Sequence, residues 1–188
     1  MISMLRIISG KYKGRKILEA NPAFTRPTTD KNKEMVFNIL GQYFSEGICL
    51  DLFAGSGALG IEALSRGMDS VSFVDSNNEA IRIIRHNLSE LHIGIGTEAW
   101  VYHQDYLLFL AEHRLQKYNL IFLDPPYATN YISQAILTIA NYQMLSADGV
   151  IVVENDKLNE TVINFNDIIL YREVVAGNSK FAFYRWRE

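Results

Sequence analysis

The segment from residue 48 to residue 67 constrains the fold more than any other part of this chain. Its apolar start, residues 48–53, predicts a short buried strand, and its amphipathic second half predicts a helix. Between them stand Gly55, Gly57 and Gly60, spaced as G-x-G-x-x-G. In such a turn the first glycine allows the tight bend, the second lets a ligand approach the backbone, and the third lets helix and strand pack closely. Because a helix N-terminus also offers free N–H groups and partial positive charge, the loop is suited to a nucleotide-like ligand.

Acidic residues near the predicted strand ends narrow the choice of that ligand. Asp75 stands where a second strand should end, and a carboxylate there can accept hydrogen bonds from ribose hydroxyls. Both NAD enzymes and S-adenosylmethionine (SAM) enzymes use this arrangement, but Asp51 inside the first strand favours SAM. Asp105 ends a third strand, where it could accept from the adenine amine of SAM or cap the next helix. The expected cofactor-binding residues are Asp51, Phe53, Gly55, Ser56, Gly57, Asp75 and Asp105.

The motif Asp124-Pro125-Pro126-Tyr127 follows an apolar strand and also favours SAM. Its prolines fix φ and remove two N–H donors, which leaves a stiff backbone rich in acceptors. The Asp124 carboxylate and the Pro125 carbonyl could each accept one N–H of a planar exocyclic amine, and Tyr127 could stack on its base. We expect these four residues to be catalytic by positioning the amine. The sulfonium of SAM is already a strong electrophile, and the four histidines show no metal-ligand spacing, so no metal is expected.

Charge is distributed unevenly along the chain. Residues 1–33 carry eight basic and two acidic side chains, a net charge of +6, which leaves −9 for the remainder at the total of −3. A basic arm on an acidic body suggests a localised phosphate-binding face. The overall acidity argues against a protein that coats nucleic acid without discrimination.

Length and composition predict one domain over residues 1–188, with a basic hairpin and linker, residues 1–27, inside it. At 48% hydrophobic and 21% charged residues, the composition is that of an ordinary globular protein. No apolar run approaches the length needed to span a membrane, and no signal peptide is expected. The single cysteine, Cys49, has no partner for a disulfide, which fits a reducing cytosol.

The order of the expected elements indicates an α/β fold with a mostly parallel sheet. Residues 5–18 predict a β-hairpin, and residues 21–27 a linker. A helix should begin near the capping residues 28–30 and end before Gly47, with Phe44 on its apolar side. A turn is expected at 148–149, and the last two strands should form an antiparallel hairpin at the sheet edge. The expected strands from residue 48 on are 48–53, 71–75, 99–103, 120–123, 150–153, 168–175 and 180–186, and the later helices lie at 77–91, 107–115 and within 132–145.

These motifs together resemble the bacterial RsmD-like family, which methylates guanine N2 in small-subunit ribosomal RNA. The similar segments are residues 6–15, 26–31, 50–60 and 124–127. The family often has glutamate where this chain has the shorter Asp75, and it usually has more basic residues around Lys31.

The resemblance implies a class I, Rossmann-like methyltransferase sheet of seven strands, the last of them antiparallel, and SAM as cofactor. It also implies that the substrate is a guanine in 16S rRNA within a partly assembled small subunit. We expect a cytoplasmic enzyme that is a monomer. The target guanine must leave its stack to reach the methyl donor, while cationic side chains hold phosphates and set register. The expected RNA-binding residues are Arg6, Lys11, Lys13, Arg15, Arg26 and Lys31.

Three other functions remain open from the sequence. A DNA adenine or cytosine amino-methyltransferase shares the Asp124 motif but normally needs a target-recognition domain. An NAD-dependent oxidoreductase explains the glycine loop and Asp75 but gives Asp124 to Tyr127 no role. A non-catalytic RNA-binding module that has kept the fold would retain RNA without binding SAM. A protein-glutamine methyltransferase would more usually carry asparagine in place of Asp124.

Overall fold

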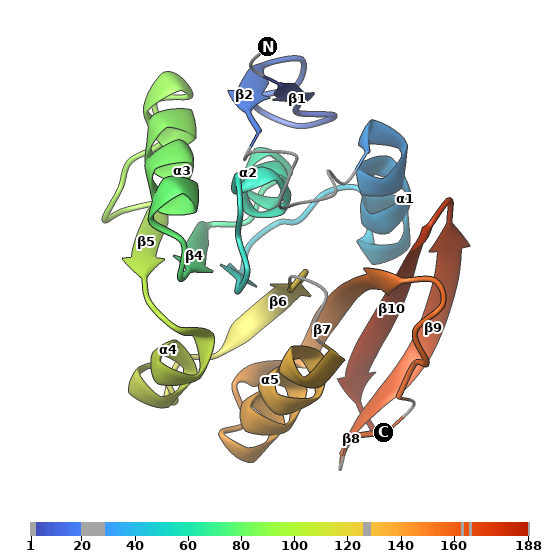
Figure 1. Cartoon of the computed structure of the whole chain (residues 1–188). Coiled ribbons are helices and arrows are strands. Elements are labelled where there is room, and N and C mark those ends of the chain that lie inside the picture. Colours follow the sequence, from blue (N-terminus) through green and yellow to red (C-terminus); the bar gives the residue numbers. More distant parts are fainter. Residues whose placement is uncertain (1–2, 20–28, 126–128, 163, 166, 188) are drawn as a thin grey trace.

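The computed structural model describes residues 3–19, 29–125, 129–162, 164–165 and 167–187. Its main sheet has eight strands in the order β5-β4-β3-β6-β7-β10-β9-β8 (Figure 1). The first five of these are parallel to one another: β5 (Ala99–His103), β4 (Ser70–Asp75), β3 (Ile48–Asp51), β6 (Tyr118–Leu123) and β7 (Leu145–Asp156). The other three continue the sheet in antiparallel pairings: β10 (Ser179–Trp186), β9 (Ile168–Ala176) and β8 (Asn164–Phe165).

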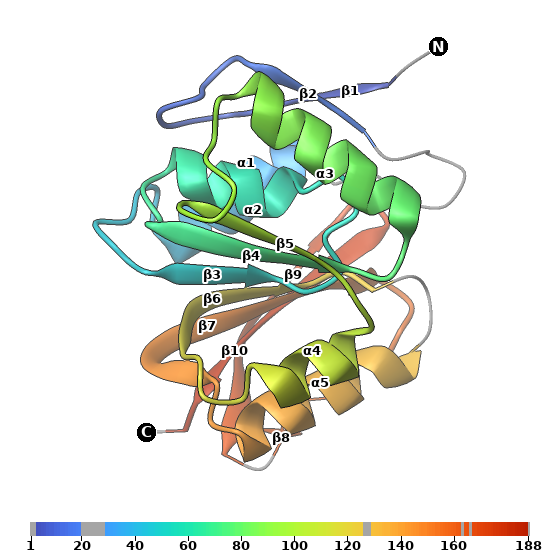
Figure 2. The same cartoon turned by 90° about the vertical axis from the view of Figure 1, so that its left-hand side faces the viewer.

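Helices cover both faces of this sheet (Figures 1 and 2). The helices α1 (Asp30–Leu40), α2 (Ala58–Ser65) and α3 (Asn78–Glu90) lie on one face, and α4 (Tyr106–Glu112) and α5 (Thr129–Asn141) lie on the other. A separate two-stranded antiparallel hairpin, β1 (Met4–Arg6) and β2 (Lys16–Leu18), lies outside α2. The class I methyltransferase fold expected from the sequence is confirmed, and the two-residue strand β8 is an eighth strand beside the seven that were predicted.

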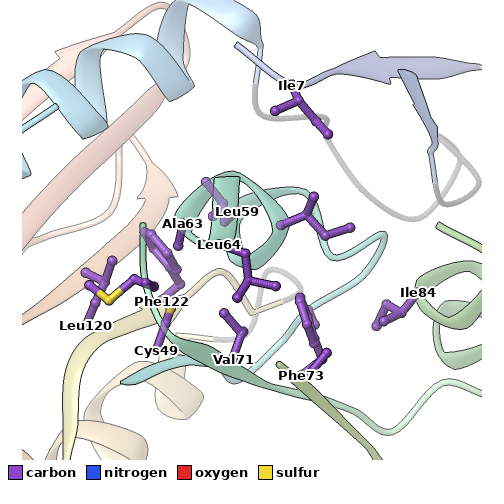
Figure 3. Close-up of a cluster of buried hydrophobic side chains, with 14 of the residues drawn as sticks. Ile7, Cys49, Leu59, Ala63, Leu64, Val71, Phe73, Ile84, Leu120 and Phe122 are labelled. Carbon is purple, nitrogen blue, oxygen red and sulfur yellow. The ribbon is translucent and has the colours of Figure 1, made fainter. Parts of the chain in front are cut away.

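Alternating side chains of the central strands divide the core into two layers. In β6, Leu120 and Phe122 face the layer under α1, α2 and α3, whereas Ile121 and Leu123 face α4 and α5. Figure 3 shows the first layer, which Ile7 of the N-terminal segment also joins. Since Ile7 is 1% exposed, the hairpin is packed onto the body of the protein through the same apolar cluster.

Polar caps begin the helices where the sequence predicted them. The Thr29 side chain accepts a hydrogen bond from the Asn32 N–H at the start of α1, and the Asn77 side chain accepts from the Glu79 N–H at the start of α3. Each cap satisfies a backbone donor that has no partner inside its helix. No helix among the described residues is long and apolar enough to cross a membrane.

Two local predictions were wrong. The turn expected at 148–149 lies inside β7, because pairing with β6 jumps from Tyr118–Leu145 to Leu120–Val150 and leaves residues 146–149 as a bulge. Helix α1 ends at Leu40, so Phe44 lies beyond it. The Phe44 ring still packs edge-on against that of Phe37, with centroids 6.3 Å apart, which explains why its spacing mimicked a helical position.

Candidate active site

Four acidic residues gather along the carboxyl edge of the sheet, where open α/β sheets bind ligands. Asp75 and Asp51 end the neighbouring strands β4 and β3, Asp124 directly follows β6, and Glu154 lies near the end of β7. Three of these were predicted as site residues, and the structure brings them to one edge. Glu154 was missed, although its place after the apolar run 150–153 repeats the pattern that identified Asp75.

The glycine loop connects β3 to α2 and has the geometry that its spacing predicted. Gly55 adopts φ +56° and Gly57 adopts φ +78°, both in the left-handed region that favours glycine. A Cβ added at Gly55 would meet no atom within 4 Å, so the space beside the loop is open. A Cβ at Gly60 would overlap the Phe73 ring, which confirms that this glycine allows close packing of α2 on the sheet.

Two carboxylates hold this loop in place. The Asp75 Oδ2 accepts a hydrogen bond from the Gly55 N–H at 2.8 Å, and its Oδ1 accepts from the Asn77 N–H at 2.8 Å. The Asp51 Oδ2 accepts from the Gly60 N–H at 3.0 Å, and this residue is only 3% exposed. Asp51 therefore joins the end of β3 to the first turn of helix α2, and Asp75 joins the end of β4 to the glycine loop at Gly55.

The buried carboxyl groups at the edge of the sheet lie close enough to one another to stabilise a bound cation. Desolvation raises the pKa of Asp51 to about 7, although the Gly60 N–H opposes this shift and the charge of Asp75 adds to it. Desolvation and the nearby charges of Glu154 and Asp51 also raise the pKa of Asp124 well above the usual carboxyl range. A cation bound here would relieve this repulsion, so these groups and the open space at Gly55 fit the sulfonium and ribose of SAM.

Aromatic rings lie beside the glycine loop. The ring of Phe53, at the start of the loop, lies 5.1 Å from that of Tyr106 and 6.2 Å from that of Tyr131, measured between centroids. The Asp105 Oδ1 accepts from the Leu107 N–H at 2.9 Å, which confirms its predicted role as the cap of α4. Its contact with the adenine of SAM stays a prediction. Tyr106 and Tyr131 were not predicted as neighbours of the site, since both occupy helical positions that look like ordinary packing in sequence.

The described part of the amine motif is Asp124 and Pro125, which are half-buried directly after β6. Pro126 and Tyr127 lie outside the described residues, as does the predicted RNA contact Arg26. Ser56, also predicted at the cofactor site, is 9% exposed, and its carbonyl accepts a hydrogen bond from the Asn87 side chain at 2.9 Å.

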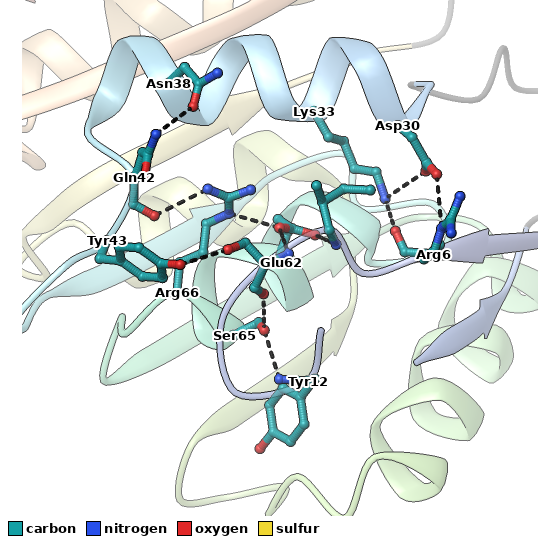
Figure 4. Close-up of polar contacts among 12 residues, drawn as sticks. Arg6, Tyr12, Asp30, Lys33, Asn38, Gln42, Tyr43, Glu62, Ser65 and Arg66 are labelled. Atoms are coloured by element: carbon teal, nitrogen blue, oxygen red, sulfur yellow. Dashed lines mark hydrogen bonds and ion pairs between the residues drawn. The ribbon is translucent and has the colours of Figure 1, made fainter. Parts of the chain in front are cut away.

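The N-terminal segment is fastened to α2 by a buried charged residue (Figure 4). The Glu62 carboxylate, with no exposed surface, accepts from the Ile8 N–H at 2.8 Å and the Ser9 N–H at 3.0 Å. It also pairs with the Arg66 Nε at 2.7 Å. Next to it, the Ser65 Oγ accepts from the Tyr12 N–H at 2.9 Å. Sequence analysis missed this function of Glu62, because an acid among apolar helix residues does not reveal which distant backbone it serves.

Asn87 of α3 fastens the other end of the hairpin. Its Oδ1 accepts from the Leu18 N–H at 2.8 Å, and its Nδ2 donates to the Leu18 carbonyl at 2.9 Å. The same Nδ2 donates to the Ser56 carbonyl, so one side chain bridges the hairpin and the glycine loop. At 1% exposed, Asn87 makes these bonds away from water.

The predicted RNA-binding cations lie on the surface, but several already have partners. Arg6 pairs with Asp30 at 3.3 Å, and Lys11 pairs with Glu98 at 3.6 Å. Arg15 donates to the Glu90 carbonyl at 2.7 Å. The side chains of Lys11, Lys13, Arg15 and Lys31 are nevertheless exposed.

One cation counted in the basic arm is not part of its surface. Lys33 is 1% exposed, and its ammonium donates to the Arg6 carbonyl and lies 3.7 Å from Asp30. Desolvation lowers its pKa, and the charges of Glu62 and Asp30 oppose that shift. The arm therefore presents less positive charge to a partner than its composition suggests.

Comparison with known proteins assigns the chain to a family. Residues 5–185 match the family model described as "Conserved hypothetical protein 95". The chain is 41% identical over 183 residues to "Putative rRNA methyltransferase YlbH" of Bacillus subtilis, which covers 97% of this chain and 100% of that protein. It is 35% identical over 182 residues to "Ribosomal RNA small subunit methyltransferase D" of Haemophilus influenzae, covering 96% and 93%.

Solved structures agree with these relatives. "Putative methyltransferase yhhF from Escherichia coli" superposes with a TM-score of 0.82 at 31% identity, covering 98% of this chain and 99% of that one. A ribosomal protein L11 methylase from Lactobacillus delbrueckii, at 18% identity and a TM-score of 0.71, shares the fold. The fold, the glycine loop, the acidic edge and the matches over nearly the whole chain lead to one conclusion: the protein belongs to the RsmD-like family of SAM-dependent methyltransferases.

Proposed function

We propose that this protein transfers a methyl group from SAM to the exocyclic N2 amine of a guanine in 16S ribosomal RNA. One observation carries the proposal: Asp124 and Pro125 follow β6, the strand that pairs with β3 of the glycine loop. An amine held by these residues lies next to the expected methyl donor. The name of the Haemophilus relative, a small-subunit ribosomal RNA methyltransferase, supports the substrate class.

The chain's own residues orient the amine and accept its proton. When bound, SAM supplies the methyl group, carried on an electrophilic sulfonium. The Asp124 carboxylate and the Pro125 carbonyl accept the two N–H bonds of N2, which directs the nitrogen lone pair toward the methyl carbon. The N2 proton passes to the Asp124 carboxylate during or after transfer. A raised pKa makes this carboxylate a better proton acceptor than an ordinary aspartate. Pro126 would stiffen the loop, and Tyr127 would stack on the guanine.

The cofactor would lie over the glycine loop. Gly55 and Gly57 leave the backbone accessible, and each Asp75 oxygen keeps a lone pair that can accept from a ribose hydroxyl. Phe53 and Asp105 would border the adenine. Asp51 and Ser56 would act on the cofactor through the loop conformation that their hydrogen bonds maintain.

The RNA would approach from the side of the N-terminal hairpin. Arg6, Lys11, Lys13, Arg15, Arg26 and Lys31 would contact phosphates, which adds affinity without reading sequence. So small a basic surface suits recognition of RNA shape within an assembling small subunit. A monomeric, single-domain enzyme acting in the cytoplasm is consistent with this proposal.

The deciding experiment measures methyl incorporation from labelled SAM into unmodified small subunits, naked 16S rRNA and duplex DNA, with a buffer control. The labelled product is then digested to nucleosides. Label recovered as N2-methylguanosine from ribosomal acceptors alone supports the proposal. Label in DNA would identify a DNA amino-methyltransferase instead, and retention of RNA without any SAM binding would identify a non-catalytic module.

A further inference from the structure

A groove lies between helix α1 and strand β9. Of the residues that line it, only Lys31 was among the predicted site residues. Its volume is about 420 Å³, and the two elements that form it are far apart in sequence, since α1 ends at residue 40 and β9 begins at residue 168. Residues from both sides line it: Lys31, Glu34, Met35, Asn38 and Ile39 of α1, and Arg172 and Val174 of β9. The α1 residues are spaced three and four apart, so they form one face of the helix.

The groove lies near the carboxyl edge of the sheet, which also carries the candidate active site. Val174 of β9 pairs with Phe181 of β10, and Phe181 pairs with Glu154 of β7, next to the strand that Asp124 follows. Adjacent strands lie about 4.8 Å apart, so three spacings place Val174 about 14 Å from β6 along the sheet. Figure 1 shows α1 beside the end of β9 that points in this direction. A strand of RNA leaving the active site could therefore enter the groove.

The side chains of the groove match the parts of a ribose–phosphate chain. Lys31 and Arg172 are exposed cations on opposite walls, and both suit phosphate oxygens. Glu34 offers acceptor oxygens to a ribose 2′-hydroxyl, a donor that DNA lacks. Met35 and Val174 give the groove apolar surface, against which a sugar can pack.

Within the described ranges, no ion pair joins Lys31 or Arg172 to another residue. Arg6 and Lys33, in contrast, both contact Asp30. With two cations, Lys31 and Arg172, and one carboxylate, Glu34, the groove lining has a net positive charge that attracts an anion.

We propose that this groove holds the RNA backbone next to the target guanine, with Lys31 and Arg172 contacting its phosphates. The inference rests on the proposed function, since it takes the RNA substrate as given. It adds strand β9 to a binding surface that the sequence placed only on the N-terminal segment.

The test compares Arg172→Ala with the wild-type protein for binding to a fluorescently labelled 16S rRNA fragment over a range of salt concentrations. We expect affinity to fall about 5- to 10-fold at low salt and the slope of log K against log salt to shrink by about one. Affinity for SAM should be unchanged, because the residue lies outside the glycine loop. Arg172→Lys should restore most of the salt slope, since the contact requires charge.

Arg114→Ala is the matched control, because Arg114 is an exposed arginine just after α4, on the opposite face of the sheet. The Arg114→Ala variant should leave both RNA affinity and salt slope unchanged.

Unchanged RNA binding by Arg172→Ala overturns the inference, even if the wild-type protein methylates rRNA. A loss seen with whole subunits but not with naked RNA also overturns it, because the groove would then contact protein. Failure of the proposed function has a different signature: RNA is bound but no N2-methylguanosine forms.

Discussion

Among single residues, Asp124 has the most direct link to the proposed chemistry. Only its ionised carboxylate can accept the amine N–H and then the proton, and burial raises the pKa at which that form appears. Turnover should therefore rise with pH through a pKa above the usual carboxyl range. Asp124→Asn should lower turnover about 10²- to 10⁴-fold and remove this rise, whereas SAM affinity should fall far less than turnover. Single-turnover rates across pH, with SAM binding by calorimetry, measure both effects; equal turnover in the two proteins would contradict the assigned role.

The raised pKa of Asp51 predicts how the stability of the folded protein depends on pH. Its folded-state pKa of about 7 lies above its ordinary value of 3.8, so the folded protein binds a proton more tightly than the unfolded chain. The contribution of Asp51 to the free energy of unfolding should therefore fall as pH rises from about 4 to about 7, by up to about 4 kcal/mol in the absence of ligand. Asp51→Asn keeps an acceptor for the Gly60 N–H but cannot ionise.

Urea unfolding of the wild-type protein and Asp51→Asn at several pH values measures this difference. We expect the variant to gain stability relative to the wild type as the pH increases. The difference between the two proteins includes the charge interaction of Asp51 with Asp124 as well as the ionisation of Asp51 itself. Parallel stability curves would mean that Asp51 titrates normally in the folded protein.

At the scale of elements, Gly60 sets the distance between α2 and the sheet. A methyl group at this position would overlap the Phe73 ring, so Gly60→Ala should destabilise the protein by about 1–3 kcal/mol despite the better helix propensity of alanine. Adding Phe73→Leu, which creates room, should recover part of that loss. A double-mutant cycle from denaturant unfolding measures the coupling, and purely additive effects would argue against the overlap.

The attachment of the hairpin to α2 depends on Glu62. Glu62→Gln would leave the Arg66 guanidinium buried without its charged partner, at a cost of about 3–5 kcal/mol. Hydrogen exchange at the Ile8 and Ser9 amides should speed up more than exchange in the central strands. The exposed Glu46 provides the control, since Glu46→Gln should change stability by less than about 0.5 kcal/mol. Equal protection of these amides in both variants would show that the apolar contacts of the hairpin suffice.

The order of strands and helices could be predicted from sequence because each signal for it is local. Apolar periodicity located β3 to β6. The predicted caps Thr29 and Asp105 directly precede α1 and α4, and α3 begins one residue after the predicted start at Asn77. The bulge at 146–149 could not be predicted, because a Gly-containing turn and a Gly-containing bulge look alike until the partner strand is known.

The site shows the same division between local and distant information. The glycine loop and Asp124 carry local motifs, so their placement at one edge followed from the fold class. Glu62 and Lys33 act on backbone 27 to 54 residues away, and nothing in the nearby sequence marks such a target. This is why Lys33 was counted in the basic arm although it lies in the interior.

For the molecule as a whole, the distribution of charge should govern RNA affinity. Lys11, Lys13 and Arg15 are exposed, and the Lys11 pair with Glu98 is a surface pair of little strength. Replacing all three by alanine should weaken RNA binding and reduce its salt slope by about two to three, without altering SAM affinity. Binding measured across salt concentrations tests this, with Arg114→Ala as control. An unchanged slope would mean that the hairpin is a structural cover for α2.

The bridge made by Asn87 also affects when the N-terminus can fold during synthesis. Leu18 is bonded to a side chain 69 residues further along the chain, and Arg15 to a carbonyl 75 residues further. The hairpin residues are therefore translated before α3, but the bonds that attach the hairpin to α3 cannot form until that helix has been translated. Such distant pairings slow folding, since loop closure must precede them. The hairpin is thus secured only after the glycine loop and α3 have been made, and the Asn87 side chain then fastens both the hairpin and the loop.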